Sequence, residues 1–296
     1  MNIALPAALE GRLPPPSSIL HDRIVLGMPH LSLGGLSETW LLKELGHRHW
    51  QLLARSAGRA VPDFRDAEGR PVYAAFGALT IAEADFGSLR EHDELSLTSE
   101  LARISRTQFA SRHAIACRGR AIGTVELSSV FVRRGEEGRN RSIARVGLDF
   151  FPPAQAKPGF GGAAALAARL RGAGWATHAG FRREEGAPSR RHVVNPCPSQ
   201  DFNGADFLYF ASFQAFVDRA EWEWFGAGGL PPALVARDIV FHGNVEIGDR
   251  VRVDLMAHRL DGRAVAHWCR LHREIDGALL ADVFTRRGAG GVDQAG

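Results

Sequence analysis

Two stretches of the chain align without a gap: residues 24–35 read IVLGMPHLSLGG, and residues 193–204 read VVNPCPSQDFNG. A valine, a proline and the final glycine coincide at one offset, 204 − 35 = 169 positions. Each stretch leads into an apolar segment that ends near a tryptophan, Ser37 to Trp50 in the first copy and Asp206 to Trp222 in the second. A repeat of this length indicates one fold unit encoded twice.

Both copies predict the same elements in the same order. The first copy has a strand at Ile24–Leu26 and a helix from Ser37 to Ala54, because apolar residues recur there with helical spacing. Its later strands are expected at Val72–Ile81, Glu94–Ser105, Gln108–Cys117 and Ala121–Arg133. The second copy predicts a strand at Val193-Val194, a helix at Asp206–Trp222, and strands at Ala236–Gly243, Arg250–Arg259, Arg263–Arg273 and Ala278–Arg286. Short polar turns join the later strands, so each copy should form an antiparallel meander.

A strand, a long helix and a curved antiparallel meander, used twice, describe an α+β protein with a double hot-dog fold. In this fold each of two tandem hot-dog units is a long helix wrapped by a curved antiparallel sheet. We expect the units at residues 21–134 and 191–287. An N-terminal arm (1–20) precedes them, a crossover linker (135–190) joins them across the surface, and a flexible tail (288–296) follows. A short helix is expected within the linker, at Ala163–Arg171.

The composition is that of an ordinary soluble globular protein. Of 296 residues, 45% are hydrophobic and 23% charged, and the net charge of +3 is not gathered in a basic run, which gives nucleic-acid binding little support. Three widely spaced cysteines favour a reducing compartment over secretion. The N-terminus lacks a signal peptide, and no apolar stretch approaches the ~20 residues of a membrane span. We therefore expect a cytoplasmic protein with neither nucleic-acid nor membrane partners.

The glycines before each helix are the first candidates for chemistry. A helix N-terminus directs backbone N–H groups outward, and glycine permits close approach of a ligand, which suits negative charge developing on a thioester oxygen. Ser37 stands at or near the first helix cap. The alternative is that these glycines only turn the chain into the helix. The candidate donors are Gly34, Gly35 and Leu36 in the first copy, and Gly204 and Ala205 in the second.

Four side chains are further candidates, each with a structural alternative. His30 is placed for acid–base work or substrate binding, or for bonding loop carbonyls. Tyr73 opens a strand where a phenol can enter the site as a donor or nucleophile. Asp201 and Asn203 are an acid/base and an amide donor, or a helix cap and a turn residue.

Two other sets of residues are interpreted structurally. Tyr209 is expected inside the second helix, as part of the core. His47 and His49 are two positions apart on a helix and so point to different faces, which argues against a metal site.

Residues 27–50, GMPHLSLGGLSETWLLKELGHRHW, and 201–210, DFNGADFLYF, resemble the bifunctional acyltransferase/decarboxylase family of the leinamycin polyketide pathway. The resemblance implies a double hot-dog enzyme that uses neither a metal nor an organic cofactor. It also implies that methylmalonyl is taken from coenzyme A, decarboxylated, and left as propionyl on the phosphopantetheine thiol of an acyl carrier protein. The active tyrosine proposed for that family lies in the first half, and Tyr73 is the residue that matches it.

Two rival functions remain open on the sequence. One is a hot-dog thioesterase or dehydratase acting on carrier-bound or CoA-bound acyl chains; a dehydratase would pair His30 with Asp201 across the cleft. The other is a non-catalytic module that binds acyl-pantetheine. Because one double hot-dog chain is already a pseudo-dimer, both a monomer and a homodimer are compatible with the sequence.

Overall fold

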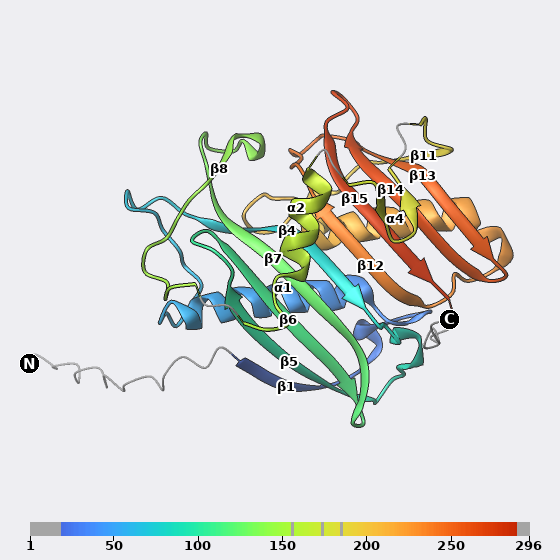
Figure 1. Cartoon of the computed structure of the whole chain (residues 1–296), viewed down its shortest axis with the longest axis horizontal. Coiled ribbons are helices and arrows are strands. Elements are labelled where there is room, and N and C mark those ends of the chain that lie inside the picture. Colours follow the sequence, from blue (N-terminus) through green and yellow to red (C-terminus); the bar gives the residue numbers. More distant parts are fainter. Residues whose placement is uncertain (1–18, 155–156, 173–174, 184–185, 289–296) are drawn as a thin grey trace, which may run out of the picture.

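The computed structural model describes residues 19–154, 157–172, 175–183 and 186–288. Within them, eleven strands form one antiparallel sheet (Figure 1). Its order is β1 (Ile19–Val25), β5 (Glu94–Arg103), β6 (Gln108–Cys117), β7 (Arg120–Arg134), β4 (Tyr73–Ala82), β12 (Leu234–Phe241), β15 (Leu279–Arg287), β14 (Ala264–Arg273), β13 (Val251–Asp261) and β11 (Arg190–Val194), with β8 (Ile143–Arg145) paired to β7. Two small separate pairs are β2 (Leu31–Ser32) with β3 (Gly35–Leu36) and β9 (Thr177–His178) with β10 (Phe181–Arg182).

The two halves of the sheet meet at the antiparallel pair of β4 and β12. Ile81 lies opposite Arg237, and Ala78 lies opposite Val240. Outward from this seam, the first half runs β4-β7-β6-β5-β1 and the second β12-β15-β14-β13-β11, so the halves repeat one topology. The chain therefore has the predicted double hot-dog fold.

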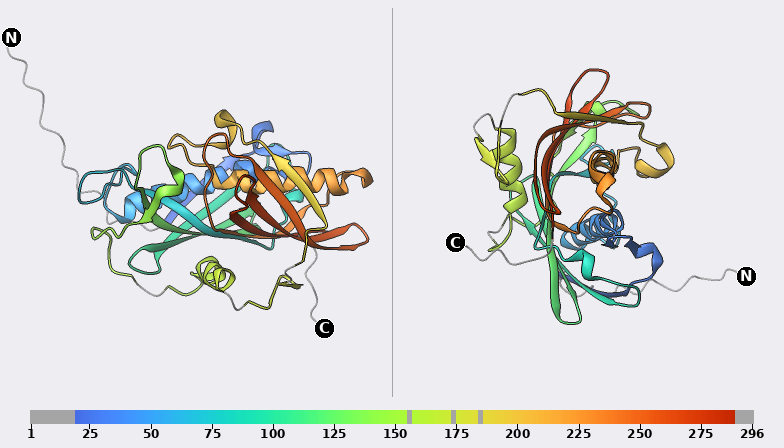
Figure 2. Two further views of the ribbon diagram at one scale, coloured as in Figure 1. Left: turned by 90° about the horizontal axis from the view of Figure 1, so that it is seen from above. Right: turned by 90° about the vertical axis from the view of Figure 1, so that its right-hand side faces the viewer.

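Helices α1 (Glu38–Ser56) and α4 (Phe210–Phe225) lie side by side on one face of the sheet, which curves around them (Figure 2). Their apolar faces enter one continuous core that both halves share, including Leu41 and Leu45 of α1 and Phe216 and Val217 of α4. Burial of the order of 1.5–3 kcal/mol per large apolar side chain stabilises this arrangement.

The first helix was predicted correctly and the start of the second was not. Ser37 caps α1, its hydroxyl accepting from the Trp40 N–H at 3.3 Å. In the second copy, Asp206 adopts a left-handed conformation (φ +60°), which interrupts a helix. The helix α4 begins only at Phe210, and the short helix α3 (Pro198–Asp201) precedes it.

The crossover linker was predicted only to run across the surface, but part of it packs into an apolar cluster. Its helix α2 (Gly162–Arg171) lies across β4 and β12 on the sheet face opposite α1 and α4 (Figure 2). There it buries Leu166 and Leu170 in an apolar cluster with Trp268 and Phe284 of the second half. Helix α2 therefore covers the seam between the two halves.

At the ends of the chain, β1 begins at Ile19, within the predicted arm and five residues before the predicted strand start at Ile24. The remainder of the arm, residues 1–18, and residues 289–296 of the tail lie outside the described residues. The three cysteines, Cys117, Cys197 and Cys269, are free thiols. Among the described helices, none has the length and apolar character needed to cross a membrane.

Two fully buried histidines join α1 to the first meander through serine hydroxyls. The His49 ring nitrogens lie 2.7 Å from Ser111 Oγ and 2.7 Å from Ser129 Oγ. Ser111 Oγ lies 2.8 Å from His113 Nε2, and His113 Nδ1 lies 2.8 Å from Ser99 Oγ. Burial lowers the pKa of His49 to about 3 and the pKa of His113 well below its ordinary value. Both rings are therefore neutral in the folded protein.

We predict that the free energy of unfolding falls as the pH is lowered from about 6.5 toward 3. In this window the unfolded chain protonates His49 and His113, whereas the folded chain does not. Each such histidine contributes about 1.4 kcal/mol per pH unit. Urea unfolding at pH 7.5 and pH 5 measures the slope. His49→Gln should show a shallower slope than the unaltered chain, and equal slopes would contradict this account.

Candidate functional site

Two cavities flank the pair of helices, and each is lined by both halves of the chain. The first, about 540 Å³, contains Tyr73 and is called the Tyr73 cavity. It lies between the start of α4, which contributes Phe210 to its lining, and the middle of α1, which contributes Gly46. The second, about 460 Å³, lies between the start of α1 and the middle of α4, represented by Glu38 and Asp218, and is called the Glu38 cavity.

The Tyr73 cavity has an aromatic wall and a polar end. The wall consists of Phe76, Phe210, Phe213 and Phe241, with Phe76 and Phe210 in direct contact at 4.3 Å between ring centroids. The polar end carries Asp63, Arg65, Tyr73, Asn203 and Asn244. Such a cavity fits a ligand with an apolar tip and a polar body.

Tyr73 is the first residue of β4 and is half-buried. Its ring meets the Phe207 ring edge-on at 5.4 Å, and the Arg134 guanidinium lies 5.6 Å from the Tyr73 ring and 4.1 Å from the Phe207 ring. No described residue forms a hydrogen bond with the Tyr73 hydroxyl. The phenol is thus held by its ring while its oxygen stays available to a ligand.

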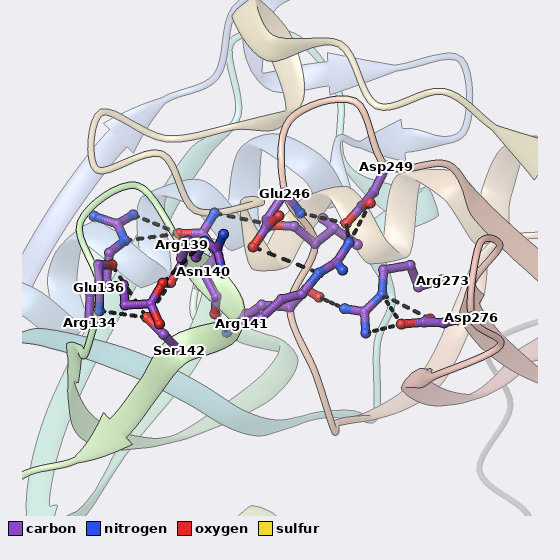
Figure 3. Close-up of polar contacts among 12 residues, drawn as sticks. Arg134, Glu136, Arg139, Asn140, Arg141, Ser142, Glu246, Asp249, Arg273 and Asp276 are labelled. Atoms are coloured by element: carbon purple, nitrogen blue, oxygen red, sulfur yellow. Dashed lines mark hydrogen bonds and ion pairs between the residues drawn. The ribbon is translucent and has the colours of Figure 1, made fainter.

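Polar contacts join the loop after β7 to loops of the second half (Figure 3). Arg134, at the end of β7, donates to Asn140 Oδ1 at 3.0 and 2.8 Å and also to the Ala205 carbonyl. Asn140 in turn donates to the Val245 carbonyl at 3.2 Å. Arg141 binds both carboxylate oxygens of Asp249 at 2.6 and 2.8 Å. The loop after β7 therefore ties two loops of the second half in place.

The loop before α4 brings Asn203 and Gly204 to the Tyr73 cavity but turns Asp201 away from it. Asn203 Oδ1 accepts from the Ala205 N–H at 2.9 Å and from the Phe207 N–H at 3.2 Å. Asn203 is therefore a turn residue, which is one of the two roles predicted for it. The buried Asp201 carboxylate accepts from the Cys197 N–H at 2.8 Å and closes the loop.

The predicted oxyanion donors of the second copy require correction. Because α4 starts at Phe210, Gly204 and Ala205 are not at the helix N-terminus, and the Ala205 N–H is already bonded. Among the described residues, the N–H groups of Phe210 and Ala211 have no acceptor, and Phe210 lines the cavity. Tyr209, predicted as a core residue inside the helix, is instead the half-buried N-cap and lines the same cavity.

In the first copy, Gly34, Leu36 and Ser37 line the Glu38 cavity, whereas Gly35 does not. Gly35 has φ +102°, and a Cβ there would lie 2.2 Å from the Phe86 carbonyl oxygen. Its conformation and packing thus require glycine, which fits the structural alternative for this position, and Gly35 is not among the residues that line the cavity.

An ionic cluster adjoins the Glu38 cavity, which its members Glu38, Asp218, Glu221 and Arg287 line. Arg237, with an exposed fraction of 0%, donates to Glu38 Oε1 at 2.9 Å and to Asp218 Oδ1 at 2.7 Å. Arg287 donates to the same Asp218 oxygen at 2.7 Å and lies 2.6 Å from Glu221 Oε1. Arg237 and Arg287 thus hold three carboxyl groups at one place.

The carboxyl groups of this cluster have different proton affinities. Burial raises the pKa of Glu38 to about 7, although the charge of Arg237 opposes the shift. Burial also acts to raise the pKa of Glu221, but the hydrogen bond from His267 and the charge of Arg287 outweigh it and lower the pKa to about 2. Carboxyls with separated pKa values are typical of acid–base sites.

His30 lines neither cavity. Its Nδ1 accepts from the Gly27 N–H at 2.8 Å, and its ring stands edge-on to Trp40 at 4.7 Å. His30 therefore does not join Tyr73 in one site. Nor does it contact Asp201 among the described residues, so the pairing expected of a dehydratase is not formed.

His47 and His49 do not share a site either. His47 bonds Gln51 at the surface, whereas His49 is fully buried in the chain of serine hydroxyls described above.

The ionic cluster was not predicted from the sequence. Glu38, Asp218, Arg237 and Arg287 come from four elements, so no local motif contains them. One usable signal was the pair Arg237 and Asp238 within the strand sequence LVARDIVF, because charges in a largely apolar strand need partners when they are buried.

No protein-family model matches the chain, and no curated protein matches it in sequence. Solved structures do match along nearly the whole length. The 12:0-ACP thioesterase from Umbellularia californica superposes with a TM-score of 0.58 and 8% identity, over 92% of this chain and 94% of that one. An acyl-ACP thioesterase from Bacteroides thetaiotaomicron gives a TM-score of 0.54 and 11% identity, over 90% and 97% of the two chains.

These likenesses define the class of fold. The chain is a double hot-dog protein, with two hot-dog units in the arrangement of these two structures. At identities of 8% and 11% the likeness concerns the fold.

We predict that Arg237→Met lowers the free energy of unfolding by about 3–5 kcal/mol, because it leaves the buried Glu38 without its cation and Asp218 with Arg287 alone. The double variant Glu38→Gln/Arg237→Met removes one of those charges and should recover at least about 1 kcal/mol of the loss. Urea unfolding of the four proteins in the cycle measures both effects. A single variant as stable as the unaltered chain would refute the structural role given to Arg237.

Proposed function

We propose that this protein is an enzyme acting on acyl thioesters, specifically a bifunctional decarboxylase and acyltransferase. It takes methylmalonyl-CoA, removes CO₂ and loads propionyl onto an acyl carrier protein in polyketide biosynthesis. The observation that carries the proposal is the place of Tyr73, at the polar end of a cavity whose other wall is aromatic. The sequence resemblance and the thioesterases of like fold support an acyl thioester as the ligand.

The first step in this proposal is loss of CO₂ from the bound thioester. The bond between the carboxylate and the α-carbon breaks, and its electron pair forms an enolate on the thioester oxygen. The helix N-terminus at Phe210 and Ala211 offers unpaired N–H groups to that oxygen. The aromatic wall of Phe76 and Phe241 withholds water from the carboxylate, which favours its departure. A proton from solvent then gives the propionyl thioester.

The second step transfers the acyl group. The Tyr73 oxygen attacks the thioester carbonyl, coenzyme A leaves as the thiol with the phenolic proton, and a tyrosyl ester forms. The carrier thiol then attacks this ester, which yields propionyl-carrier and restores the phenol. Neither step uses a metal or an organic cofactor. The partners in this proposal are coenzyme A and an acyl carrier protein in the cytoplasm, and the enzyme acts as a monomer or homodimer.

We predict that Tyr73→Phe abolishes propionyl loading, because the variant keeps the ring contacts with Phe207 and Arg134 but lacks the oxygen. The assay combines the protein, methylmalonyl-CoA and a phosphopantetheinylated carrier from its own gene neighbourhood, and weighs the carrier by intact mass spectrometry. Tyr209→Phe removes the other hydroxyl that lines the cavity and serves as the matched control, with loading within about 3-fold of the unaltered chain.

The same assay separates the rival functions. A methylmalonyl increment on the carrier means transfer without decarboxylation. Free acid with an unmodified carrier means a thioesterase, and binding without turnover means an acyl-binding module. Near-normal loading by Tyr73→Phe removes Tyr73 from the mechanism.

A further inference from the structure

The two cavities occupy equivalent positions in the duplicated fold. The helix caps Ser37 and Tyr209 are 209 − 37 = 172 positions apart, and the same offset relates Trp50 to Trp222. By this offset Glu38 corresponds to Phe210, and Gly46 corresponds to Asp218 (46 + 172 = 218). Glu38 and Asp218 line one cavity, and Phe210 and Gly46 line the other.

The strand residue that meets these positions also differs between the cavities. In the Tyr73 cavity, Phe76 of β4 packs on Phe210 and lies 3.8 Å from the place of a Cβ on Gly46. In the Glu38 cavity, Arg237 of β12 binds Glu38 and Asp218. At these three positions the Tyr73 cavity has two phenylalanines and a glycine, whereas the Glu38 cavity has two carboxyl groups and an adjoining arginine. The two cavities therefore differ in their chemistry.

The Glu38 side chain is suited to accept a proton inside this cavity. Its Oε1 accepts from Arg237, whereas Oε2 forms no hydrogen bond among the described residues. The charged groups facing it are Arg237 from β12, Asp218 and Glu221 from α4, and Arg287 from β15. Because burial raises its pKa to about 7, both protonation states of Glu38 are populated at neutral pH.

The cavity also offers a place for a polarised carbonyl. Glu38 and Thr39 are the first two residues of the 19-residue helix α1, and both line the cavity. Their N–H groups have no acceptor among the described residues. Apolar residues of the 230–234 segment form the opposite wall. A carbonyl oxygen near these N–H groups would lie next to the free carboxyl oxygen of Glu38.

We propose that the Glu38 cavity is a second reaction centre, in which Glu38 is the general base for hydrolysis of a short acyl thioester. The substrate class rests on the function proposed above; the residues and the chemistry do not. The short acyl group follows from the propionyl product of that function, and Asp218, Glu221 and Arg287 line the cavity beside Glu38.

The reaction needs only water as a co-reactant. The Glu38 carboxylate takes a proton from water as the water oxygen attacks the thioester carbonyl carbon. The resulting oxyanion accepts hydrogen bonds from the α1 N-terminus. The carbon–sulfur bond then breaks, the leaving thiolate receives the proton from Glu38, and a carboxylic acid and a thiol are released.

The test uses a Tyr73→Phe background, in which the first cavity cannot form an acyl ester. Thiol release from acetyl-CoA and propionyl-CoA is followed without any carrier protein. Adding Glu38→Gln should lower kcat/KM by about 10²–10⁴-fold, the usual contribution of a general base. In the parent, kcat/KM should rise with pH through about 7, because the base must be deprotonated, and this rise should be absent in the Glu38→Gln protein.

A matched control is Glu44→Gln, which alters a half-buried carboxyl of the same helix that binds Arg48 outside the cavity. It should leave thiol release unchanged. Thiol release within about 3-fold of the parent in Glu38→Gln overturns the proposal, and so does the absence of thiol release from either acyl-CoA by the parent. Carrier loading by the unaltered chain reports separately on the function of the Tyr73 cavity, so the two proposals fail independently.

Discussion

The antiparallel pairing of β4 with β12 is the contact on which the rest of this structure depends. It joins two five-stranded halves into one sheet, and it removes two edge strands that would otherwise expose unpaired backbone groups. The same seam sets α1 beside α4, so that the start of each helix faces the middle of the other. Both cavities are lined by residues of the two halves. Neither hot-dog unit alone therefore supplies the whole lining of either cavity.

The two halves share one backbone topology, but the side chains around their two cavities differ. Phe76 and Phe210 make one cavity aromatic, while Arg237 and Glu38 make its counterpart ionic. An aromatic wall favours an acyl group and disfavours hydration of a carboxylate, whereas buried ion pairs separate the proton affinities of neighbouring carboxyls. The proposed acyl transfer at Tyr73 and the proposed hydrolysis at Glu38 follow from this difference. In these proposals, one duplicated backbone supports two kinds of chemistry on one class of substrate.

The repeat and the helical spacing were sufficient to predict the fold, because the cap at Ser37 and the short polar turns between strands, such as the one at Gly262 between β13 and β14, act locally. The start of α4 was predicted wrongly because the turn around Asn203, stabilised by side-chain bonds, is followed by the left-handed Asp206. The prediction also identified four residues of the Tyr73 cavity, since Tyr73, Asn203, Gly204 and Ala205 all line it. The ionic cluster escaped prediction because its members are up to 287 − 38 = 249 positions apart and only the tertiary fold brings them together.

The claim that an acyl thioester binds in the Tyr73 cavity is tested most directly by hydrogen exchange. The protein would be compared with and without an unreactive thioether analogue of propionyl-CoA, and exchange would be resolved by peptide. This account predicts slower exchange at residues 73–76 and 203–213, which line that cavity from both halves of the chain. Slower exchange confined to the segments 32–39 and 230–234, which contain residues that line the Glu38 cavity, would contradict it.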